Sequence, residues 1–149
     1  MKSTKIVIDL FDFIKEGIFG DINIGMSKEE VLCIFPDPDD WMNGYDMQNS
    51  PFWRYGNFEL HFIDHKLAFI FNDYVNEISA GKKLKLNKWL LKRKKLFLKD
   101  IVKELDRQKI AYDRVDREFG IDIIIRNSNV VLSFSVEDNK NEMTFIEKR

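Results

Sequence analysis

Strict alternation of apolar and polar side chains constrains the fold of this chain more than any other feature of its sequence. Residues 58–62, FELHF, alternate in this way, and a second apolar run over residues 67–71 follows the turn Asp64-His65. A period of two is typical of a strand with one buried face. Because so short a connection joins neighbouring strands that run in opposite directions, the pattern predicts an antiparallel sheet.

Further strands are predicted where β-branched and aromatic residues lie between turn clusters such as Gly56-Asn57 and Asn127-Ser128-Asn129. They cover residues 52–55, 111–115, 121–126, 130–136 and 143–146. Near the start, the pattern fits either a short helix over residues 8–15 or a strand over residues 5–8.

Two helices have clear signals. Ser27 followed by Glu30 is a capping box, in which each side chain accepts a hydrogen bond from the other residue's backbone amide. This helix is expected to end before Pro36, because proline disfavours helical geometry in the residue before it. A second amphipathic helix is predicted from the apolar spacing over residues 98–109, and a shorter one around residues 89–91.

Both halves of the chain run from helices to a meander of strands, so one α+β domain over residues 1–149 is predicted, with repeat halves of about 1–80 and 81–149. The alternative is that any two hairpins look alike at this level of detail. Helices on one face of an antiparallel sheet would leave the other face open to a protein partner.

Composition narrows the setting. Apolar residues make up 44% of the 149 residues, which is enough for a core, and Cys33 is the one cysteine. Without a signal-peptide pattern or a run of about 18 apolar residues, we expect a cytoplasmic protein with no membrane span. Residues 1–80 carry 6 basic and 14 acidic side chains, whereas residues 81–109 carry 12 basic and 3 acidic ones.

An acidic loop with aromatic residues follows the first helix and is the main candidate for partner binding. Its carboxylates could occupy a basic cleft while its aromatic side chains supply buried area. The alternative is a solvated turn whose tryptophan packs onto the core. The candidate residues are Asp37, Asp39, Asp40, Trp41, Tyr45, Asp46 and Trp53.

The basic segment over residues 82–95 is the second candidate, for nucleic acid or another anionic partner. The alternatives are a solvated helix face and docking of this segment onto the acidic half of the same chain. The residues concerned are Lys82, Lys83, Lys85, Lys88, Trp89, Lys92, Arg93, Lys94 and Lys95.

Catalytic and metal-binding signatures are not evident, so no enzyme activity, cofactor or metal is predicted. His61 and His65 flank a predicted turn, and no third ligand accompanies them. Cys33 is expected to be a buried small apolar residue of its helix.

Residues 23–36, NIGMSKEEVLCIFP, resemble a helix start of the form Gly-Met-Ser/Thr-x-x-x-Val. It is found in proteins of the β-lactamase-inhibitory-protein type, which are tandem repeats of helix pairs and strands, and in the small lipoprotein of the outer-membrane barrel-assembly machinery. Residues 52–62 resemble a strand pair of bacterial immunity proteins, which neutralise toxins. The resemblance covers about residues 23–70, and the second half has Leu96-Phe97-Leu98-Lys99 at the equivalent place. It implies a non-enzymatic protein that binds and blocks another protein. Together with the acidic aromatic loop, this leads to the hypothesis of an immunity protein that occludes the active site of a cognate toxin such as a nuclease.

Overall fold

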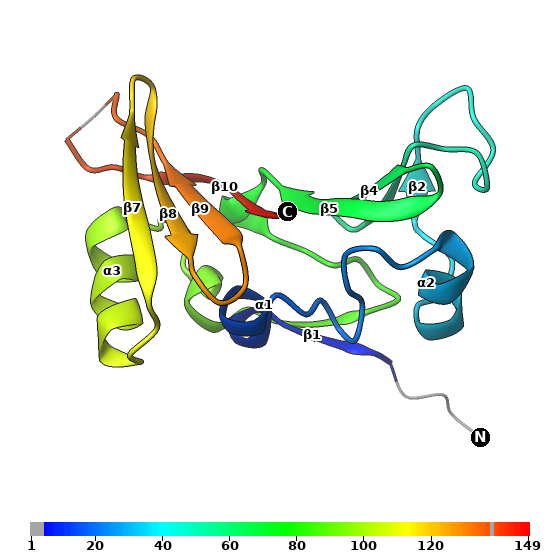
Figure 1. Cartoon of the computed structure of the whole chain (residues 1–149), viewed down its shortest axis with the longest axis horizontal. Helices are drawn as coiled ribbons and strands as arrows, with labels where there is room; N and C mark the ends of the chain where they lie inside the picture. The colour runs from blue at the N-terminus through cyan, green and yellow to red at the C-terminus, as the bar shows by residue number, and fades with distance from the viewer. Residues whose placement is uncertain (1–4, 138) are drawn as a thin grey trace.

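An eight-stranded antiparallel sheet dominates the computed structural model, which describes residues 5–137 and 139–149. Its strand order is β2-β3-β4-β5-β10-β9-β8-β7 (Figure 1). The strands are β2 (Asp40–Trp41), β3 (Phe52–Tyr55), β4 (Phe58–Ile63), β5 (Lys66–Asn72), β7 (Tyr112–Arg117), β8 (Gly120–Ile125), β9 (Val130–Phe134) and β10 (Met143–Lys148). The antiparallel sheet expected from the alternating pattern is therefore confirmed.

The three helices lie on one side of this sheet, as Figure 1 shows, so the α+β class with helices on one face is also confirmed. They are α1 (Leu10–Glu16), α2 (Lys28–Ile34) and α3 (Leu98–Arg107). The capping box of α2 is present: the Glu30 amide donates to Ser27 Oγ at 3.1 Å, and the Ser27 amide donates to Glu30 Oε1 at 3.2 Å. None of the helices in the described part of the chain has the length and apolar character needed to cross a membrane.

The first residues contain both of the elements that the sequence left open. Strand β1 (Val7–Asp9) pairs in parallel with β6 (Lys85–Asn87), and α1 begins at the next residue. Asp9 ends the strand and caps the helix, since its side chain accepts a hydrogen bond from the Asp12 amide. Two short 3₁₀ turns, Val75–Glu77 and Trp89–Lys92, complete the connections, and the second replaces the short helix predicted there.

The two halves of the large sheet have the same order of elements. In each half a helix leads to an edge strand, and a meander then runs inward until β5 and β10 pair at the centre. The residue before each helix also bridges to the innermost hairpin of its half, Ser27 to Lys66 and Phe97 to Glu142. This correspondence matches the predicted halves in layout, while their origin by duplication stays a prediction.

The core lies between the helices and the sheet. Phe19 sits at its centre, with ring centroids 5.3 Å from Phe13 of α1 and 4.8 Å from Phe58 of β4. Cys33 was predicted to be a buried apolar residue of α2, and this prediction was wrong, because the residue is exposed. Val31 and Phe35 define the buried side of α2. Cys33 lies two positions from each of them, so it is rotated by about 200° around the helix and faces solvent.

Candidate protein-binding surface

The sheet face opposite the helices carries a row of aromatic and charged side chains, which we call the uncovered face. Strand register places its members side by side, because Phe52 pairs with His61, His61 with Phe69, Glu59 with Phe71, and Phe71 with Glu147. These side chains are half-buried, and the helices of the described residues lie on the other side of the sheet. The uncovered face consists of Phe52, Arg54, Glu59, His61, Phe69, Phe71, Phe145 and Glu147.

Neighbouring rings on the uncovered face contact one another. His61 stacks on Phe69 with centroids 4.3 Å apart and a plane angle of 12°, and Phe52 lies 5.3 Å from the other side of the imidazole. The His61 Nε2 atom is 2.8 Å from Glu59 Oε1. These contacts give the histidine a packing role, and no group of three or more His, Cys, Asp or Glu side chains in residues 5–137 and 139–149 could hold a metal ion.

The acidic loop extends across strand β2, since Asp37 and Asp39 precede the strand and Asp40 and Trp41 form it. Tyr45 and Asp46 lie in residues 42–51, which join β2 to β3 and which we call the long hairpin loop. Trp53, which was predicted to contact a partner, is instead fully buried and donates its indole N–H to the Met47 carbonyl at 2.7 Å. The prediction was wrong for this residue because Trp53 shares the core-facing side of β3 with Tyr55. Trp41 is half-buried, and its indole N–H donates to the Tyr45 carbonyl at 2.9 Å.

Lys28 holds the long hairpin loop from below. Its side chain is only 3% exposed, and its ammonium donates to the carbonyls of Gln48 at 2.7 Å and Ser50 at 2.9 Å. The ammonium also lies over the ring of Trp53 at 5.6 Å. Burial lowers the pKa of Lys28, and the nearby carboxylates of Glu29 and Asp46 offset part of that shift. The loop is therefore fixed by buried groups.

The carboxylates of the acidic segment are mostly engaged within the chain. Asp39 Oδ2 accepts from the Gly56 amide at 2.7 Å, and Asp40 Oδ2 pairs with Arg54 at 2.9 Å. Asp46 accepts from both the backbone and the side-chain amide of Asn49. The four aspartates of the acidic loop are all exposed: Asp37, Asp39, Asp40 and Asp46. Burial is the main reason why the pKa of Tyr55 is raised, and the negative charges of Asp37 and Asp39 raise it further.

Tyr45 is the most exposed of the three aromatic residues among the predicted contacts. It lies in the long hairpin loop with 50% of its surface exposed, although its backbone is held by Trp41. A pocket of about 590 Å³ lies at the base of this loop and is lined by Tyr45, Trp41, Phe52 and Arg54 among others. The sequence-based candidates thus reduce to an exposed tyrosine with carboxylates around it.

A second hairpin, at the opposite edge of the sheet, was missed by the sequence analysis. Residues 118–119 form the short hairpin turn between β7 and β8, and Phe119 is 84% exposed. A phenylalanine in a two-residue turn is a signal that could have been noticed, because such turns favour Gly, Asn and Asp. Figure 1 shows that both hairpins project away from the helices, at opposite ends of the sheet.

The short hairpin turn is also held by a buried charge. Asp122 on β8 is 5% exposed, accepting from Arg117 Nε at 2.6 Å and from Ser133 Oγ at 2.7 Å. A pocket of about 530 Å³ beside it is lined by Phe119, Phe145 and Arg149 among others. Each end of the uncovered face therefore carries an exposed aromatic side chain next to a pocket.

Comparison of the chain with protein-family models, curated proteins and solved structures found no match. The arrangement of the site is therefore what bears on function.

The basic segment lies on the helix side of the molecule, in β6 and the turn that follows it. Lys83 docks onto the acidic segment, since its ammonium lies 3.1 Å from the Asp37 carbonyl and 3.5 Å from the Pro38 carbonyl. Trp89 is half-buried against Phe11, with ring centroids 5.1 Å apart. The cationic residues are all exposed: Lys82, Lys83, Lys85, Lys88, Lys92, Arg93, Lys94 and Lys95.

Proposed function

We propose that this chain is a protein-binding inhibitor of the immunity type, which receives a segment of another protein on the uncovered face between the two hairpins. One observation carries the proposal: topologically equivalent hairpins at the two ends of the sheet each present an exposed aromatic residue, Tyr45 or Phe119. Exposed aromatic side chains beside pockets are the typical anchors of protein interfaces.

Rigid presentation of these residues supports the proposal. Lys28 fixes the loop that carries Tyr45. Asp122 on β8 binds Arg117 on β7 and Ser133 on β9, and this fixes the turn that carries Phe119. A pre-ordered anchor loses little conformational entropy when it binds, so more of the contact energy appears as affinity. Between the anchors, the rings of the uncovered face offer apolar area that no helix in the described part of the chain covers.

Charge favours a basic partner. Asp46 follows Tyr45 in the long hairpin loop, and Asp40 on β2 lines the same pocket as Tyr45. Both carboxylates are exposed, so negative charge lies beside this anchor, and the exposed Asp37 precedes β2. A cleft that binds nucleic acid is lined by cations and would be complementary to this loop. We therefore propose a nuclease toxin as the partner and the cytoplasm as the place of action, where an exposed thiol such as that of Cys33 stays reduced.

The test uses the protein encoded immediately upstream of this chain. We expect it to be lethal when expressed alone and harmless when co-expressed with this chain, and we expect the purified pair to bind in calorimetry. Replacing Tyr45 or Phe119 by serine is expected to weaken that binding by about 30-fold each.

Val7→Ser is the matched control, because Val7 is 47% exposed on β1, on the far side of the helices. Its affinity is expected to equal that of the unchanged chain. If the upstream protein is harmless, stays lethal in co-expression, or binds both anchor variants normally, the proposal is wrong.

A nucleic-acid-associated accessory protein is the second candidate, favoured by the exposed cations of residues 82–95. It predicts that the logarithm of the affinity for a short DNA or RNA duplex falls linearly with the logarithm of salt concentration. Fluorescence anisotropy measures this directly, and the absence of binding at about 50 mM salt would dismiss the candidate.

A further inference from the structure

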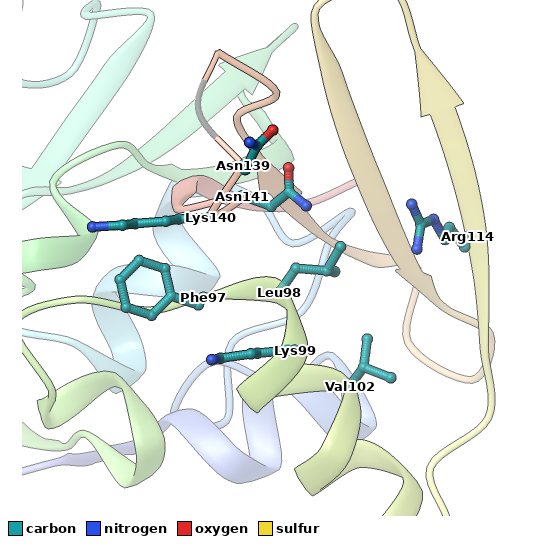
Figure 2. A pocket seen from close by; sticks show the side chains of 8 residues that line it. All are labelled: Phe97, Leu98, Lys99, Val102, Arg114, Asn139, Lys140 and Asn141. Atoms are coloured by element: carbon teal, nitrogen blue, oxygen red, sulfur yellow. The ribbon is translucent and has the colours of Figure 1, made fainter.

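A pocket of about 470 Å³ lies in the second half, between the start of α3, strand β7 and residues 139–141 (Figure 2). It is separate from the uncovered face. Arg114, which lines it from β7, pairs in register with the buried Ile123, so it lies on the helix side of the sheet. The volume is within the range of about 300–1,000 Å³ that small-molecule sites occupy.

The wall contributed by α3 is apolar. Leu98 and Val102 are four residues apart and therefore share one face of the helix, and Phe97 precedes them at the N-cap. In the view of Figure 2, Leu98 and Val102 lie between Arg114 on one side and Phe97 on the other. An apolar group of a ligand would find hydrocarbon and a ring to pack against.

The polar part of the lining is cationic. Lys99, Arg114 and Lys140 line the pocket together with two asparagine side chains, and no acidic side chain of residues 5–137 or 139–149 lines it. The first-turn amides of Leu98, Asp100 and Ile101 already donate to backbone carbonyls, so the attraction for an anion comes from the side chains. The nearest compensating charge on β7 is Asp116.

Asp116 positions Arg114 without using all of it. One carboxylate oxygen, Oδ1, lies 3.1 Å from Arg114 Nε and 3.0 Å from Nη2. A guanidinium has five N–H donors, so the Nη1 amino group is left to donate to a bound anion. Arg114 and Lys99 are both exposed and can adjust to a ligand without disturbing the core.

From these features we propose that the pocket binds a small amphipathic anion: an apolar ring or chain that packs on Leu98 and Val102, with an acidic head group held by Arg114. In Figure 2 the Lys99 side chain extends away from Arg114, so it adds positive charge to the lining without sharing the head group. The positive charge of the lining favours an acidic head group, and the apolar wall favours a ligand with an apolar ring or chain. This inference is independent of the proposed function, because it uses residues on the other side of the sheet and needs no protein partner.

A pair of fluorescent probes separates charge from hydrophobicity. 8-Anilinonaphthalene-1-sulfonate carries a sulfonate, and N-phenyl-1-naphthylamine has the same ring system without it. We expect saturable one-site binding of the sulfonate probe to the folded chain, about tenfold tighter than binding of the neutral one. Octanoate should compete with it, and the amide shifts in a nitrogen-15 NMR titration should centre on residues 97–102, 114 and 139–141.

Arg114→Gln is expected to lower the affinity for the sulfonate probe about tenfold and to leave the neutral probe unaffected. Lys99→Gln should have a smaller effect in the same direction. Arg107→Gln is the control, since this exposed arginine pairs with Glu104 on α3 and does not line the pocket. Equal affinity for both probes, no response to Arg114→Gln, or NMR shifts centred on another region would each overturn the proposal.

Discussion

The two hairpins at the ends of the sheet make the same connection in different ways. Ten residues, 42–51, join β2 to β3 in the first half, whereas two residues, 118–119, join β7 to β8 in the second. Because two residues suffice to close the equivalent turn, the fold does not require the extra length of the long hairpin loop. The loop supplies acceptors to the buried Lys28 and Trp53, and we propose that its extra length serves partner binding.

The hairpins are alike in how they are held. Lys28 and Asp122 are the two charged side chains among the described residues that are buried, and each secures one hairpin. A buried charge is costly unless its hydrogen-bonding capacity is met, so removing it leaves its former partners without a match. The contrast between a long and a short connection can thus be tested by replacing the buried charge that secures each of them.

Lys28→Ala is expected to have the largest effect, a loss of about 3 kcal/mol in the free energy of unfolding measured by urea denaturation. The carbonyls of Gln48 and Ser50 would lose their donor, and the rings of Trp53 and Phe62 would lose the stem and charge of the lysine. Lys66→Ala, at an exposed site in the same half, serves as the control. A loss no larger than that of the control would mean that the long hairpin loop is stable without Lys28.

Asp122→Ala is expected to cost less, about 2 kcal/mol in the same measurement. Arg117 can turn to solvent after the change, because 54% of its side chain is exposed, but the buried Ser133 hydroxyl would lose its acceptor. Asp116→Ala, which removes an exposed carboxylate of the same hairpin, should change stability by less than about 1 kcal/mol. Equal losses in the two variants would show that Asp122 has no special place in the short hairpin turn.

Ser27→Ala sharpens the comparison between the helices of the two halves. It should cost about 1 kcal/mol, since the Glu30 amide loses its acceptor at the start of α2. The equivalent residue before α3 is Phe97, whose side chain makes no capping hydrogen bond. A double-mutant cycle with Glu30→Ala measures the coupling, and strictly additive losses would contradict a reciprocal capping box.

Much of the fold could be predicted because one face of each strand must be buried. The alternation over residues 58–62 has one register that hides Phe58, Leu60 and Phe62, and the structure adopts it. The capping box was equally local, since its two partners are three residues apart. By contrast, the parallel pairing of β1 with β6 joins residues 78 positions apart, such as Val7 and Lys85, and no local pattern specifies it.

The site was harder to predict than the fold because exposure depends on which face a residue occupies. Trp41 and Trp53 look alike in the sequence, yet Trp53 lies on the core side of β3 and Trp41 is half-buried on the edge strand beside it. The exposure of Phe119 was not predicted, because apolar residues are usually buried. It follows from the two-residue turn, which leaves the side chain at the tip of the hairpin. Tyr45, in contrast, was predicted and is exposed.

The smallest expected effect concerns acid, and it distinguishes the halves by how their helices are stabilised. Hydrogen bonds from Arg107 and Gln108 lower the pKa of Glu104 on α3 from its usual 4.5 to about 2. Below pH 4.5 the unfolded chain therefore binds a proton that the folded chain does not, so this stabilisation is complete above pH 4.5 and is lost as pH falls toward 2.

Helix α2 depends instead on a serine hydroxyl as its main cap acceptor. Amide hydrogen exchange between pH 5 and pH 2.5 should thus show protection falling more in α3 than in α2, and Glu104→Gln should reduce that difference because it removes the titrating group. The effect is small because Arg107, the main hydrogen-bond donor to Glu104, is exposed to solvent over 67% of its side chain. An equal loss of protection in both helices, unchanged by Glu104→Gln, would mean that the two halves lose stability in acid for a common reason.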